Sequence, residues 1–218
     1  MTRKQIVTRF HLLVLGFLVA ITATAYVKIP AGTDLPVHWG LNGTPDWVWP
    51  RNTALLIFPT VAVLLTALFA LIGQFAPVEK IEPGRYVSEA LLSGLLIMFD
   101  ALQIGLLMIG LGSDIDMVRI VGFGVALVLL LLGATLPTSE YNAYAGVRLP
   151  WTFRNAGHWR SSHRVAGILC IIAGLGLGVA AWLFPDPGTV MLALLAAVFM
   201  PLILAVLYSV LRSFSAKS

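Results

Sequence analysis

Residues 142–152 read NAYAGVRLPWT, and they separate two long apolar segments at 118–136 and 163–184. This polar stretch continues to Gly167 and is the most polar and basic part of the chain. A helix needs about 20 apolar residues to cross the roughly 30 Å of bilayer hydrocarbon, and both flanking segments are close to that length. The pattern predicts two spanning helices joined by a polar loop.

The composition extends this prediction to the whole chain. Of its 218 residues, 59% are hydrophobic and only 11% are charged, whereas soluble domains carry about 25% charged residues. So few charges cannot cover a surface that faces water, so the chain is expected to lie in lipid. The single cysteine, Cys170, falls in an apolar run and allows neither an internal disulfide nor a cysteine metal cluster.

Six segments are long and apolar enough to span a membrane, and most of the stretches between them begin with or contain proline or glycine. These segments are residues 6–27, 53–76, 87–111, 118–136, 163–184 and 189–211. The sequence therefore predicts an all-α integral membrane bundle of six transmembrane helices. No linker divides the chain, so residues 1–218 are expected to form a single membrane domain.

The placement of positive charge predicts the orientation of the bundle. Eleven of the 14 Lys and Arg residues fall in the segments on the N-terminal side of the membrane, and loops rich in Lys and Arg stay in the cytoplasm. Both termini and the loop at 142–162 are therefore expected to be cytoplasmic, and the loop at 30–52 to face outward. An alternative is that the basic N-terminus and the apolar run at 10–27 form a cleaved signal peptide, although this run is long enough to span.

The outward loop at 34–49 contains Asn42-Gly43 and Pro45-Asp46, which favour turns, so the loop is expected to be ordered and to double back. It also contains Trp39, Trp47 and Trp49. These side chains suit either a belt at the lipid headgroups or a recognition surface for a peptide, given the nearby His38. His38 and Asp46 are too few to predict a metal site.

Asp100 lies near the middle of the third apolar segment, with Gln103 one helical turn further on the same face. A carboxylate at the bilayer centre costs about 2.5–3.5 kcal/mol on insertion scales. It is therefore expected to face the bundle interior. It could serve as a proton or ligand site, or it could make a structural hydrogen bond that fixes helix packing.

The inward loop combines charge with residues that restrict the backbone. Arg148 and Arg164 can bind carboxylates or carbonyl groups through paired hydrogen bonds. Gly146 permits a turn with positive φ, and Thr152 is expected to cap a short interfacial helix at 153–160. The alternative is that the arginines only enforce topology and bind anionic lipid. That alternative does not explain the Asn, Gly, Pro and Thr of the same loop.

These residues also carry a family resemblance. The inner pattern of Asn142, Tyr144, residues 146–152, Asn155, Trp159, His163, Arg164 and Gly167 resembles the signature of the SdpI family of membrane immunity proteins. Residues 35–39 with Gly43, Pro45, Asp46 and Trp47 resemble an uncharacterised N-terminal domain often found with that family. The resemblance implies an N-terminal helix pair with the outer loop at 1–76 and an SdpI-like part at 118–211.

The resemblance implies resistance to a secreted antimicrobial peptide toxin at a bacterial cell membrane. It also implies a signalling role, in which toxin engagement recruits a cytoplasmic transcriptional repressor to the membrane. The implied binding residues of the inner loop are Asn142, Gly146, Arg148, Pro150, Trp151, Thr152, Trp159, His163 and Arg164. Those of the outer loop are Pro36, His38, Trp39, Gly43 and Asp46.

No catalytic residue follows from the resemblance, and the sequence lacks the metalloprotease, serine hydrolase and phosphate-loop motifs. We therefore expect no enzymatic activity, cofactor or bound metal. The expected partners are membrane lipid, the peptide toxin and the repressor, without direct contact to nucleic acid. The alternative function is a small-solute or proton-coupled transporter that uses Asp100 and Gln103.

Overall fold

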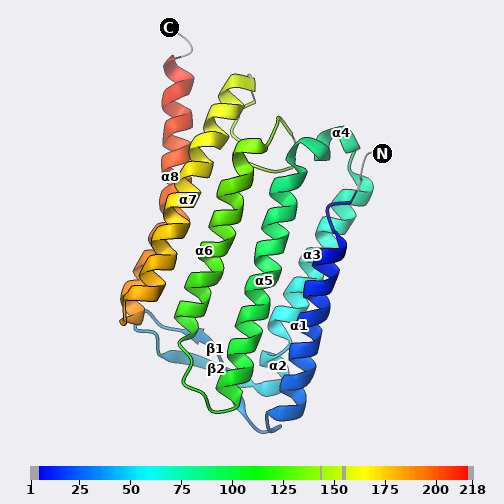
Figure 1. Cartoon of the computed structure of the whole chain (residues 1–218), viewed down its shortest axis with the longest axis vertical. Coiled ribbons are helices and arrows are strands. Elements are labelled where there is room, and N and C mark those ends of the chain that lie inside the picture. Colours follow the sequence, from blue (N-terminus) through cyan, green and yellow to red (C-terminus); the bar gives the residue numbers. More distant parts are fainter. Residues whose placement is uncertain (1–4, 143, 154–155, 216–218) are drawn as a thin grey trace.

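A computed structural model describes residues 5–142, 144–153 and 156–215. Six long helices stand side by side in it, and each is apolar and long enough to cross a membrane (Figure 1). They are α1 (Arg9–Lys28), α3 (Ile57–Phe75), α5 (Arg85–Gly110), α6 (Met117–Thr135), α7 (Ala156–Leu183) and α8 (Pro187–Ser215). The predicted six-helix membrane bundle is confirmed.

Short elements complete the connections between the long helices. They are α2 (Arg51–Ala54), α4 (Val78–Ile81) and the 3₁₀ turns η1 (Glu82–Gly84) and η2 (Leu136–Thr138). The predicted segments agree with the helices to within a few residues, except that α7 begins seven residues before the expected position 163. That extension changes the expected structure of the inner loop.

The helices pack mainly in sequence order. α5, α6, α7 and α8 each contact the next, while α1 and α3 pack against α5 and against each other. Between α6 and α7 the backbones approach closely, because a Cβ atom on Gly167 would lie 2.8 Å from the Gly133 carbonyl oxygen. Small residues at such crossings let membrane helices pack through their backbones.

α1 begins and α8 ends at the same end of the bundle, as an even number of spans requires (Figure 1). The loop between α6 and α7 lies at that end too (Figure 1). The chain thus has two opposite ends, here called the inner end and the outer end after the predicted orientation. That the inner end faces the cytoplasm stays a prediction from the charge distribution.

A two-stranded hairpin lies across the outer end, and the all-α prediction did not include it (Figure 1). Its strands β1 (Asp34–Trp39) and β2 (Pro45–Pro50) pair antiparallel, with irregular register between Pro36 and Trp39. Gly43 in the turn has φ of 76°, a conformation that glycine adopts without strain. Leu35 of β1 is only 1% exposed and packs into the core formed by α1, α3 and α5. The hairpin is therefore part of the packed structure.

Candidate functional site

Asn142 organises the inner loop. Its side-chain amide donates to Ser139 Oγ at 3.0 Å and to the Glu140 carbonyl at 2.9 Å. Its Oδ1 accepts from the backbone N–H groups of Tyr144, at 2.9 Å, and Ala145, at 2.7 Å. The side chain is buried, and all these bonds close the loop onto itself. Asn142 therefore has a structural role in this conformation.

Gly146 and His163 form a second fastening point between the loop and α7. The Val147 N–H donates to His163 Nε2 at 2.9 Å, so the ring proton lies on Nδ1, which donates to the Trp159 carbonyl at 2.8 Å. Gly146 has φ of 113°, and a Cβ atom there would overlap His163 Nε2. Only glycine can adopt this positive φ without strain and also leave room for the His163 ring.

Trp159 lies beneath the loop and is only 1% exposed. Its indole N–H donates to the Ser139 carbonyl at 2.9 Å, and its ring stacks on His163 with centroids 4.1 Å apart. Tyr141 and Phe153 pack on it, each with a centroid distance of 5.6 Å. The loop thus wraps around the first turns of α7, with Trp159 as its core.

Thr152 forms hydrogen bonds within the loop, and the predicted separate interfacial helix at 153–160 is wrong in that its residues 156–160 belong to the spanning helix α7. The Thr152 hydroxyl donates to the Leu149 carbonyl at 2.8 Å and accepts from the Leu149 N–H at 3.0 Å. Residues 156–160 belong to α7, because His158 and Trp159 are buried against neighbouring elements and extend the packed face of that helix inward. Residues 154 and 155, which were part of the prediction, lie outside the described residues.

A buried polar cluster between α7 and α8 was not predicted. Ser209 of α8 accepts a hydrogen bond from Trp151 Nε1 at 2.9 Å and one from the Ser162 hydroxyl at 3.2 Å. His158 Nε2 lies 3.0 Å from the Ser209 carbonyl oxygen. The only sequence signal was a serine within an otherwise apolar segment. The cluster ties α8 to the inner loop through Trp151.

Four of the nine predicted inner residues are exposed, namely Gly146, Arg148, Pro150 and Arg164, and of these Gly146 also contacts His163. Within the part of the chain that the structure describes, neither arginine forms an ion pair. The other five residues are engaged in the contacts described above. The predicted inner site therefore divides into residues that hold the loop in place and residues that are free to meet a partner.

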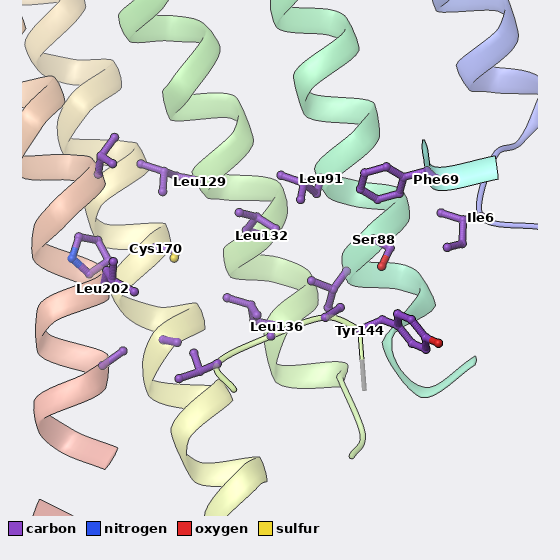
Figure 2. Close-up of a pocket in the computed structure, with 18 of the residues that line it drawn as sticks. Ile6, Phe69, Ser88, Leu91, Leu129, Leu132, Leu136, Tyr144, Cys170 and Leu202 are labelled. Carbon is purple, nitrogen blue, oxygen red and sulfur yellow. The ribbon is translucent and has the colours of Figure 1, made fainter. Parts of the chain in front are cut away.

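Beneath the loop lies an apolar cavity of about 380 Å³, here called the inner groove (Figure 2). α5, α6 and α7 form its floor, with Leu91, Leu132 and Cys170 among the lining side chains, and α3 and α8 flank it. Tyr144 and its neighbours in the loop close the inner end. The fastened loop therefore forms part of the wall of this groove at its inner end.

The predicted residues of the outer loop also divide into residues that hold the hairpin in place and residues that are exposed. Pro36 is buried, Trp39 packs against the cluster of Val118, Ala181 and Val190, and a Cβ atom on Gly43 would overlap Pro187. These three residues hold the hairpin on the helices. A pocket of about 390 Å³, also lined by Asp114 and Asp116, opens between the hairpin and the connection from α5 to α6.

His38 and Asp46 lie on the exposed face of the hairpin. His38 Nδ1 and Asp46 Oδ1 are 2.6 Å apart, and the two side chains are 62% and 51% exposed. Trp47 beside them is 59% exposed, and its ring meets Trp49 edge-on at 5.8 Å. This face presents an aromatic surface with polar groups that can donate and accept hydrogen bonds.

Asp100 and Gln103 are buried in the middle of α5, as predicted. Gln103 Nε2 donates to the Leu55 carbonyl at 3.1 Å, between α2 and α3. Among the described residues, Asp100 Oδ1 and Gln103 Oε1 have no hydrogen-bond partner. Neither residue lines the inner groove or the outer pocket. Across the described residues no cluster of three His, Cys, Asp or Glu side chains could bind a metal ion.

Six apolar spans with ordered loops at both ends define a multi-pass membrane protein. Residues 138–209 match the SdpI/YfhL protein family, and residues 13–63 match DUF1648, a domain of unknown function. The immunity protein SdpI of Bacillus subtilis (strain 168) is 22% identical over 206 residues, which cover 94% of each chain. No solved structure matches the chain. The two matched regions contain the two loops that carried the resemblance read from the sequence, and that resemblance is confirmed.

Proposed function

We propose that this protein is an immunity protein, which protects the cell that carries it against a secreted antimicrobial peptide toxin. The observation that carries the proposal is the similarity to immunity protein SdpI, which covers 94% of both chains. That similarity includes both matched regions and therefore both of the ordered loops. A binding role also agrees with exposed aromatic and basic side chains at the two ends of the bundle.

The toxin meets the outer hairpin in this proposal. The exposed face with Trp47, His38 and Asp46 offers an apolar ring and a hydrogen-bonded His–Asp pair within one small surface. Exposed aromatic side chains of this kind contribute much of the energy in peptide interfaces. Pro36, Trp39 and Gly43 then act indirectly, because they hold that face in position on the helices.

The inner loop serves a second proposed step, the recruitment of a cytoplasmic repressor. Arg148 and Pro150 are exposed on a loop that is fastened to α7 through His163 and Trp159 and to α8 through Trp151. A fixed loop presents an arginine without the entropy cost of ordering the backbone on binding. Arg148 can therefore bind a carboxylate or carbonyl group of a protein partner.

Survival of a sensitive bacterium exposed to a peptide toxin tests the immunity function. Empty vector, wild type and Trp47→Ala are compared at matched membrane abundance, with Arg148→Ala as a separate arm. We expect wild type to protect and Trp47→Ala to lose at least tenfold in protection. Leu41→Ala is the matched control, because Leu41 is also exposed, at 68%, but lies in the turn of the hairpin.

The separate arms distinguish the two proposed steps. Arg148→Ala is expected to keep protection while losing repressor recruitment, measured as the membrane-bound fraction of the repressor. Loss of protection in Arg148→Ala alone would place the toxin-dependent contact at the inner end. A well-inserted wild type that gives no protection against any toxin tested would refute immunity.

Transport through Asp100 stays a hypothesis based on the sequence. Asp100 Oδ1 is buried and has no hydrogen-bond partner among the described residues, which favours transport. Asp100 lines neither the inner groove nor the outer pocket, which argues against transport. Proton flux in liposomes, compared between wild type and Asp100→Asn, decides between transport and a structural role. Equal flux in both proteins would exclude a route that depends on this carboxyl group.

A further inference from the structure

We propose that α7 carries a binding site for one anionic phospholipid, with the lipid phosphate between Arg160 and Arg164. The site goes beyond the proposed immunity function and does not depend on it. It lies on the exposed side of α7, in a pocket of about 490 Å³ that we call the arginine pocket. Pro137 of η2 and Tyr208 of α8 also line it.

The two arginines lie one turn apart on the same face of the helix. Both are exposed, and within the described residues neither forms an ion pair or a hydrogen bond. Two like charges at this spacing destabilise a helix slightly unless an anion lies between them. A phosphate group can accept hydrogen bonds from both guanidinium groups at once.

Further donors surround the same pocket. Arg212 of α8 donates to the Tyr208 hydroxyl oxygen at 3.3 Å, which places a third positive charge beside the pocket. The Tyr208 hydroxyl keeps its own proton to donate. Among the described residues, no carboxylate lines the pocket to oppose an anion.

The face of α7 continues below the arginines as a strip of exposed apolar side chains. Ile168 is 51% exposed, Ile172 62%, Leu175 56% and Val179 54%. They follow Arg164 at helical spacing on the same side as the arginine pair. From Arg164 to Leu175 the helix rises about 16 Å, which matches one leaflet of a hydrocarbon core about 30 Å thick.

This arrangement distinguishes a phospholipid from a soluble phosphate compound. The charged pocket and the apolar strip together match a headgroup followed by acyl chains, while free phosphate would use only the pocket. The pocket also lies at the inner end, where the charge distribution predicts the cytoplasmic leaflet and its anionic lipids. Basic pockets between membrane helices on that side bind anionic headgroups.

Native mass spectrometry of the purified full-length protein tests the site. The protein is incubated with equal amounts of phosphatidylglycerol and phosphatidylcholine of the same acyl chains, and the ratio of the bound lipids is measured. We expect wild type to prefer phosphatidylglycerol. Arg160→Gln and Arg164→Gln should each reduce that preference about fivefold, from the usual contribution of one arginine near an anionic surface.

Arg9→Gln is the matched control, because Arg9 is also exposed at the inner end but lies on α1, away from the pocket. It should leave the lipid preference unchanged. The double variant Arg160→Lys with Arg164→Lys keeps both charges and should retain the preference, which separates loss of charge from loss of folding.

Three results would overturn the proposal. One is an equal preference for phosphatidylglycerol in wild type and in both glutamine variants. Another is displacement of the lipid by 10 mM inorganic phosphate, which would indicate a site for soluble phosphate. The third is the absence of any preference in wild type, which would indicate that the arginines bind an acidic protein partner and not a lipid.

Discussion

Replacing Gly146 with alanine should release the inner loop from α7. The residue has φ of 113°, and a non-glycine residue in such a sparsely populated region costs about 1–3 kcal/mol. The added Cβ would also overlap His163 Nε2 and so break the bond from the Val147 N–H. A net loss of about 1 kcal/mol for that bond gives a total of about 2–4 kcal/mol.

Hydrogen exchange of the backbone amides at 144–152 measures this loss locally. Every 1.4 kcal/mol changes an equilibrium constant tenfold, so exchange should accelerate by between about thirtyfold and several hundredfold. Gly112→Ala is the matched control, because Gly112 also has positive φ, at 90°, but a Cβ there meets nothing within 4 Å. It should leave exchange at 144–152 unchanged.

A double-mutant cycle separates strain from overlap. In a His163→Ala background the overlap and the hydrogen bond are both absent, so Gly146→Ala should then cost about 1 kcal/mol less than in wild type. An unchanged exchange rate in Gly146→Ala would refute the proposed fastening of the loop. A cost that is the same in both backgrounds would refute the part assigned to His163.

Three further changes test other contacts. Gly43→Ala should separate the hairpin tip from Pro187, seen as faster exchange across β1 and β2 while exchange in the bundle stays constant. Trp159→Phe removes the bond to the Ser139 carbonyl but keeps an aromatic ring, so it should lower the free energy of loop opening by about 1–3 kcal/mol. Two hydrogen bonds from Thr189 lower the pKa of the exposed Asp186 carboxyl group. The ionised carboxylate therefore stabilises the start of α8 fully above the ordinary aspartate pKa, and this stabilisation is lost as the pH falls through the lowered pKa of Asp186. Asp186→Asn should remove this pH dependence of exchange in the first turn of α8, and a pH dependence equal to that of wild type would contradict the assignment.

Much of this protein follows from sequence alone. The apolar segments predicted all six spans, because hydrocarbon thickness fixes the length of a spanning helix whatever the helix packs against. The turn residues around Gly43 predicted that the outer loop doubles back, and the structure has a hairpin there. The same local patterns carried the family resemblance, which the comparisons confirm.

The roles of individual polar residues needed the tertiary structure. Threonine is a common helix-capping residue, and only the structure shows that the Thr152 hydroxyl bonds to Leu149 within the loop and that residues 156–160 belong to α7. Ser209 gave almost no signal, since its partners Trp151 and Ser162 are about 50 residues away in the chain. Hydropathy and helical period are local properties of a sequence, whereas a hydrogen bond between distant segments depends on which helices pack together. For this reason the sequence alone determined the membrane bundle, and only the packed structure decided which signature residues fasten the loops and which are free to bind.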